Sequence, residues 1–78
     1  MSEQVLSYLA KSLVDRPDDV SVTAVDEGEG DIVLELRVHP EDMGKVIGKR
    51  GRTAKAIRTM VKAAASREGT NATVEIVE

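Results

Sequence analysis

The sequence has no cysteine, tryptophan or phenylalanine, and it contains only one tyrosine and one histidine. Without cysteine there are no disulfides and no thiolate metal ligands, and the single imidazole of His39 excludes a multi-histidine metal site. The near absence of aromatic rings also removes the stacking platforms on which many nucleic-acid-binding domains hold bases. We therefore expect neither a disulfide-stabilised scaffold nor a metalloenzyme, and no cofactor.

The chain also lacks long apolar runs. No run approaches the roughly 20 residues that span a bilayer, so we expect no membrane association. Residues 1–10 lack the basic stretch and apolar core of a secretory signal. The 78 residues suffice for one domain, which we expect to span residues 1–78. The expected location is the cytoplasm.

Apolar spacing predicts six elements. A stripe at helical spacing predicts a helix over residues 3–15, which Pro17 ends because the residue before a proline avoids the α region. Alternating residues predict two strands that form a hairpin, with Val20, Val22 and Ala24 on the buried face of the first. The expected ranges are strands over 20–26 and 31–38, a turn over 27–30, helices over 40–47 and 52–67, and a strand over 72–77.

The order helix, strand, strand, helix, helix, strand indicates an α+β fold. Three strands with three helices on one face form two layers around one core. The last helix is expected to bury an arc composed of Ala54, Ile57, Met60, Val61 and Ala64.

The charge of the chain is unevenly distributed. The formal net charge is −3, which by itself argues against a polyanionic partner. However, residues 45–67 hold eight of the eleven basic residues and no acidic residue. Because physiological salt screens charge over roughly 8 Å, a ligand senses this local cluster more than the distant total. Such a cluster is either a solvated helix face or the footprint of a nucleic acid.

The segment Gly48-Lys49-Arg50-Gly51 favours the second interpretation. Glycine leaves room for a sugar-phosphate backbone and adopts positive φ without strain. The following helix begins with Arg52 and Lys55, and cations there oppose the helix dipole at a cost of about 0.3–1 kcal/mol each. A bound phosphate would reverse that effect, because the helix end and the cations would both attract it.

The basic residues of the last helix share one flank. Arg52, Lys55, Arg58 and Lys62 fall within about a third of the helical circumference, at about 100° per residue. A strand of nucleic acid held in the glycine loop can follow this flank. The alternative is that the Lys and Arg stems only cover the edge of the core, which fits Lys62 best.

These residues resemble a known family. Val46-Ile47-Gly48-Lys49-Arg50-Gly51 resembles the Val-Ile-Gly-x-x-Gly signature of KH domains, and the element order is similar to their type II arrangement. Over essentially its whole length the chain is most similar to the small stand-alone bacterial KH proteins of the KhpA group. The run Gly48 to Arg58 carries much of this likeness.

The resemblance implies a mixed sheet in which the last strand lies beside the first and parallel to it. It implies single-stranded RNA in a groove between the loop and the sheet, with Lys49 and Arg50 on phosphate. Val46 and Ile47 would form an apolar floor or belong to the core. The expected RNA-binding residues are Lys45, Val46, Ile47, Gly48, Lys49, Arg50, Gly51, Arg52, Lys55 and Arg58.

The resemblance also implies a role and partners. A protein of this group would act as a post-transcriptional regulator or RNA chaperone linked to cell elongation and division. It would form a homodimer, or a heteromer with a larger KH-containing RNA-binding protein. From the residues themselves, Ala56, Thr59 and Ala63 form a small-residue strip that permits close helix contact. The same strip is equally explained by helix propensity.

Three other functions were weighed. An enzyme is not expected. The sequence pattern offers the serines no His and Asp partners for catalysis, and His39, which precedes Pro40, is expected to cap a helix or to pack. Gly48 to Gly51 is also not a P-loop, which needs longer glycine spacing and a Gly-Lys-Ser/Thr ending. A helix-turn-helix DNA binder fits the basic second helix. A protein-interaction module with an acidic partner fits the basic cluster.

Overall fold

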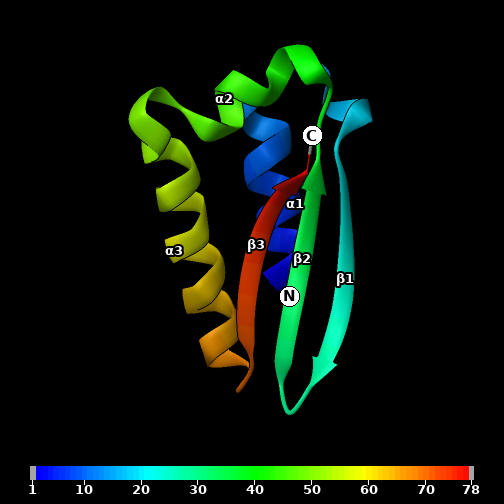
Figure 1. Cartoon of the computed structure of the whole chain (residues 1–78), viewed down its shortest axis with the longest axis vertical. Helices are drawn as coiled ribbons and strands as arrows, with labels where there is room; N and C mark the ends of the chain where they lie inside the picture. Colours follow the sequence, from blue (N-terminus) through cyan, green and yellow to red (C-terminus); the bar gives the residue numbers. More distant parts are fainter. Residues whose placement is uncertain (1, 78) are drawn as a thin grey trace.

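The structure, a computed structural model, describes residues 2–77, so the expected domain of residues 1–78 includes two terminal residues outside that range. It confirms the α+β class and the predicted order of elements (Figure 1). The helices are α1 (Ser2–Leu13), α2 (Met43–Ile47) and α3 (Arg52–Arg67), and the strands are β1 (Ser21–Gly28), β2 (Asp31–Arg37) and β3 (Asn71–Val77). Three short 3-10 turns complete the chain: η1 (Pro17–Asp19), η2 (Pro40–Asp42) and η3 (Lys49–Gly51).

The three-stranded sheet has β2 at its centre. β1 pairs with β2 antiparallel, and β3 pairs with the other edge of β2 in parallel. The expectation that the last strand lies beside the first was therefore wrong. The register places Ala72 and Val74 next to Ile32 and Leu34, which continues one apolar row across two strands. β1 offers no such row, because it is exposed from Thr23 onward.

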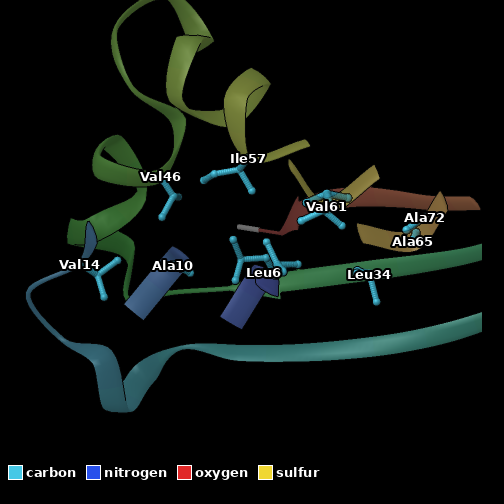
Figure 2. Packing of buried hydrophobic residues seen from close by; sticks show 11 residues of the cluster. Leu6, Ala10, Val14, Leu34, Val46, Ile57, Val61, Ala65 and Ala72 are labelled. Atoms are coloured by element: carbon cyan, nitrogen blue, oxygen red, sulfur yellow. The ribbon is translucent and has the colours of Figure 1, made fainter. Parts of the chain in front are cut away.

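The core lies between the sheet and the helices. Leu6 and Ala10 of α1 and Leu34 of β2 are fully buried and belong to one apolar cluster. Figure 2 shows the side chains of Val46 and Ile57 pointing toward this group from above. Helix α2, although only five residues long, thereby contributes one fully buried residue to the core.

Three details of the predicted burial were wrong. Met60 is 53% exposed, and Ala65 is fully buried where Ala64 was expected. Both Met60 and Ala64 lie on the flank of α3 that borders Val5 of α1, where a shallow depression remains open. In β1, Ala24 is exposed because the helices cover only the beginning of this edge strand.

The expected helix over residues 40–47 consists of two pieces, the turn η2 and the helix α2. Nδ1 of His39 accepts a hydrogen bond from the backbone N–H of Glu41 at 3.1 Å, which confirms a capping role for this histidine. Asp42 then points inward and is fully buried. This acidic residue, which stands at the start of α2, is thus an internal group.

The basic loop and the acidic turn occupy opposite ends of the molecule. The connection between α2 and α3 lies at one end, and the turn between β1 and β2 lies at the other (Figure 1). The acidic residues Glu27, Glu29 and Asp31 belong to the second end. A polyanion at the basic loop is therefore kept away from this part of the negative charge.

Candidate nucleic-acid interface

The loop between α2 and α3 is built from unusual backbone angles. Gly48 ends α2 with φ 76° and ψ 171°, and its N–H donates to the carbonyl of Gly44 at 2.9 Å. Arg50 has φ 60° and Gly51 has φ 72°, and the N–H of Gly51 donates to the carbonyl of Gly48 at 3.2 Å. Three positive φ angles within four residues fold the chain into a tight turn that leads directly into α3.

The two glycines of the loop have different roles. A Cβ at Gly48 would overlap Thr53, lying 2.6 Å from its Cβ and 2.9 Å from its backbone nitrogen. A Cβ at Gly51 would meet open space, so only the positive φ favours glycine there. Gly48 is therefore required both by its positive φ and by close packing against the start of α3, and Gly51 by backbone angle alone.

Four cations surround this turn without internal partners. Lys49, Arg50, Arg52 and Lys55 are exposed. Within residues 2–77, none of their side chains takes part in an ion pair. Arg50 holds its position in a left-handed conformation that costs a non-glycine residue about 1 kcal/mol or more. A strained, exposed cation of this kind suits a binding role better than a stabilising one.

The first turn of α3 adds hydrogen-bond donors to this cation cluster. The first N–H groups of a helix have no partner within the helix. In α3 the N–H of Arg52 already donates to the carbonyl of Lys49, whereas the N–H groups after it receive no side-chain cap from Gly51, and the first turn contains no acidic residue. Together with the positive end of the helix dipole, these groups favour an anion in front of the loop.

An apolar groove borders the loop. It has a volume of about 370 Å³ and is lined by Met43, Ile47, Gly51, Ala54, Arg58 and Ile76. The residues come from α2, η3, α3 and β3, so the groove runs from the loop to the edge strand β3 of the sheet. Arg58 is its single charged residue, and Nε of Arg58 donates to the carbonyl of Val74 at 3.4 Å.

The structure brings most of the predicted site residues to this end of the molecule. Ile47 is 38% exposed and lines the groove together with Gly51 and Arg58. Val46 is fully buried and belongs to the core, which settles the alternative left open by the sequence. Sequence analysis missed Met43, Ala54 and Ile76 as groove residues. Met43 stands four residues before Ile47, and this helical spacing was a usable signal.

Lys45 differs from the other predicted site residues, because carboxylates already hold it. Its Nζ lies 2.7 Å from Oδ2 of Asp15 and 3.5 Å from Oδ1 of Asp42. The hydrogen bond to Asp15 raises the pKa of Lys45 above its usual range, with partial burial acting in the opposite direction. Burial by itself would raise the pKa of Asp42, but hydrogen bonds from the backbone N–H groups of Arg16 and Asp15, together with the hydrogen bond and charge of Lys45, lower it below the usual range. Both groups are ionised at neutral pH.

Residues 2–77 offer neither a metal site nor a membrane-spanning helix. No cluster of three or more His, Asp or Glu side chains there is arranged to hold a metal ion. In the same part of the chain, none of the helices has the length and apolar character needed to cross a membrane.

Comparisons with known proteins identify the fold and the family. A crystal structure of Era in complex with MgGDPNP and nucleotides 1506–1542 of 16S ribosomal RNA matches with a TM-score of 0.69 at 19% identity. The match covers 96% of this chain and 28% of the Era chain, so this chain corresponds to a little over a quarter of that protein.

Relatives are found over nearly the full length of the chain. A protein of Clostridium acetobutylicum named RNA-binding protein KhpA is 61% identical over 75 residues, covering 96% of this chain and 99% of the relative. A protein of the same name from Treponema pallidum is 49% identical over 78 residues, covering all of this chain and 96% of the relative. The family model described as KhpA/KhpB, KH domain matches residues 3–76. The chain therefore belongs to the KhpA/KhpB family of KH domains.

Proposed function

We propose that this chain acts as one KH domain that binds single-stranded RNA and catalyses no reaction. The observation that carries the proposal is an exposed turn at the start of α3 and beside an apolar groove, whose Lys49 and Arg50 take part in no ion pair within the described residues 2–77. The relatives named RNA-binding protein KhpA support RNA as the partner. Their names describe binding proteins, in line with a role that needs no cofactor.

The phosphates are assigned to the loop and to the first turn of α3. Lys49 and Arg50 supply charge, and the first N–H groups of α3 supply directed donors for a phosphate oxygen. Arg52 and Lys55 extend the same positive surface by one turn of the helix. The net charge of −3 does not oppose this assignment, because the cations lie close to the ligand and salt screens the rest.

The bases are assigned to the groove. Met43, Ile47 and Ile76 offer aliphatic surface to the face of a base, since none of the groove residues is aromatic. The terminal N–H groups of Arg58 are parallel donors, which match bases with two adjacent acceptors such as O6 and N7 of guanine. Aliphatic contact without stacking implies modest affinity for one copy of the domain.

The direct test compares single-stranded RNA with duplex DNA by fluorescence polarisation across a salt series. Three to four phosphate contacts predict that log K falls with log salt at a slope of about −2 to −3, because each contact on a single strand contributes about −0.7. The expected result is a clear preference for the single strand. A preference for duplex DNA would contradict the proposal and favour a helix-turn-helix binding mode.

Arg58→Met is expected to relax base preference without changing the salt slope. The substitution keeps an apolar stem in the groove and removes the donors. Two oligonucleotides that differ at one base should then bind with more similar affinities, and the expected loss of discrimination between them is about 1–3 kcal/mol. Lys62→Met is the matched control one turn further along α3 and outside the groove. A shallower salt slope in Arg58→Met would assign Arg58 to phosphate instead.

The cellular role is proposed from the family. We assign the domain to post-transcriptional regulation or RNA chaperone activity connected with cell elongation and division, in the cytoplasm. We also propose self-association or pairing with a larger KH-containing protein. The open flank of α3 supports such contact, because Met60, Ala63 and Ala64 form a shallow apolar depression with Val5 there. Ala56 and Ala63 of the small-residue strip are exposed on this helix.

A further inference from the structure

A buried carboxylate ties the base of the loop-bearing helix to the end of α1. Asp42 is fully buried, and its Oδ2 accepts a hydrogen bond from the backbone N–H of Arg16 at 3.1 Å. Its Oδ1 lies 3.5 Å from Nζ of Lys45 and 3.8 Å from Nη1 of Arg16. A buried charge is tolerated only when it is well paired, and these contacts pair it.

Two further ion pairs reinforce the same junction. Nζ of Lys45 donates to Oδ2 of Asp15 at 2.7 Å, and Nη2 of Arg16 lies 3.5 Å from Oε2 of Glu41. Residues 15–16 and residues 41–45 are thus connected by several polar contacts. Exposed ion pairs are individually weak, at about 0–1 kcal/mol. The buried carboxylate gives this set its fixed geometry.

Helix α2 needs such an attachment. It has five residues, and a helix of this length is not stable in isolation because its nucleation is unfavourable. Val46 is its only buried residue. Gly48 follows directly, and its N–H bonds back to Gly44 within the helix. The position of the loop therefore depends on how α2 is held at Val46 and at Asp42.

Lys45 points away from the proposed RNA site. It stands two residues from both Met43 and Ile47, so at 100° per residue it lies about 160° around α2 from each of these groove residues. Its ammonium group is held by carboxylates on that opposite side. This position does not suit a contact with RNA in the groove.

We propose that Asp42, Lys45 and the backbone N–H of Arg16 form a clamp that positions the Gly48–Gly51 loop, and that Lys45 is a positioning residue without contact to RNA. The proposal rests on the RNA-binding function proposed above. The clamp acts by fixing α2, so its loss makes the loop mobile and weakens binding while every phosphate-binding side chain remains. This separates Lys45 from Lys49 and Arg50 in function, although all three belong to one basic segment.

The test uses four variants of the full chain, Asp42→Asn, Lys45→Met, Asp15→Asn and Arg50→Ala. The first three are the clamp variants, because Asp15→Asn removes the second carboxylate that holds Lys45. Each is expected to bind single-stranded RNA about three- to tenfold more weakly, within the roughly 2- to 30-fold range for substitutions that act without ligand contact. The salt slope should stay at the wild-type value in the clamp variants and fall by about 0.7 in Arg50→Ala. Asp15→Asn changes an exposed residue, so it is informative even if Asp42→Asn does not fold.

Amide hydrogen exchange without RNA gives an independent readout. The amides of Gly48 and Gly51 should exchange faster in the clamp variants, and the amide of Val61 in α3 should not. A salt slope in Lys45→Met as shallow as that in Arg50→Ala would overturn the clamp. Tighter RNA binding by Asp15→Asn would also overturn it, and so would amide exchange at the wild-type rate in Asp42→Asn. Absence of RNA binding by the wild type would overturn the proposed function, while the exchange data would still decide the clamp.

Discussion

Replacing Lys49 and Arg50 together by aspartate is expected to weaken binding of single-stranded RNA by at least about 100-fold. A hydrogen bond to a charged group contributes about 1.5–3 kcal/mol, and about 1.4 kcal/mol corresponds to a factor of ten. The loss of two such contacts is therefore enough for a change of about 100-fold in affinity. Repulsion between phosphate and the new carboxylates would weaken binding further. Fluorescence polarisation at constant salt measures the change.

The fold should be unaffected by this substitution. Both side chains are exposed and, within residues 2–77, take part in no ion pair. Lys62→Asp with Arg67→Asp is the matched control, because it changes the net charge equally on α3. Lys62 lies ten residues beyond Arg52, about 15 Å along the helix axis. Equal loss of RNA binding in the control would indicate a response to overall charge, and normal binding by Lys49→Asp with Arg50→Asp would refute the loop as the phosphate site.

The local structure was largely predictable because glycine and proline mark its boundaries. Helix α3 occupies the predicted residues 52–67, between Gly51 and the positive-φ residue Gly69. The strands lie within about two residues of their predicted limits. Alternation and helical spacing depend on near neighbours in the sequence, so these elements follow from local rules.

The sheet order was not predictable in the same way. Pairing of β3 with β2 joins residues 40 apart in sequence, such as Asp31 and Asn71. It depends on which edge of the hairpin offers an apolar row, and β1 is exposed over most of its length. The sequence pattern of β1 alternates like that of β2, and only the limited cover by the helices distinguishes the two strands.

The cations of the candidate site were predicted from the sequence, whereas the apolar residues that line its groove were not. Gly48 to Gly51 are adjacent in the sequence, so the motif is visible there. The groove instead combines Met43 with Ile76, and apolar residues on amphipathic elements resemble core residues until the fold brings them together. Lys45 is the opposite case. It was predicted as a site residue because it belongs to the basic segment, but in the structure it pairs with Asp15, which is 30 residues away in the sequence.

Gly48→Ala is expected to destabilise the protein and to weaken RNA binding at least about tenfold. With φ 76° and ψ 171°, Gly48 occupies a region that is essentially restricted to glycine, and a strained residue costs about 1–3 kcal/mol. The new Cβ would also overlap the backbone nitrogen of Thr53, at 2.9 Å. Overpacking of this kind costs about another 1–3 kcal/mol. We expect a loss of about 2–6 kcal/mol in the free energy of unfolding, measured by urea denaturation.

Two other glycines serve as controls that separate backbone angle from packing. Gly51→Ala also places alanine at a positive φ, but in the left-handed helical region (φ 72°, ψ 13°) and with open space around its Cβ, so the expected loss is only about 1–2 kcal/mol. Gly44→Ala has open space and a helical backbone, and the better helix propensity of alanine should stabilise α2 by up to about 1 kcal/mol. The order of stability should therefore be Gly44→Ala, Gly51→Ala, Gly48→Ala. If Gly48→Ala were as stable as Gly51→Ala, contact with Thr53 would not determine the shape of the loop, and RNA phosphate would be the remaining reason for a glycine at position 48.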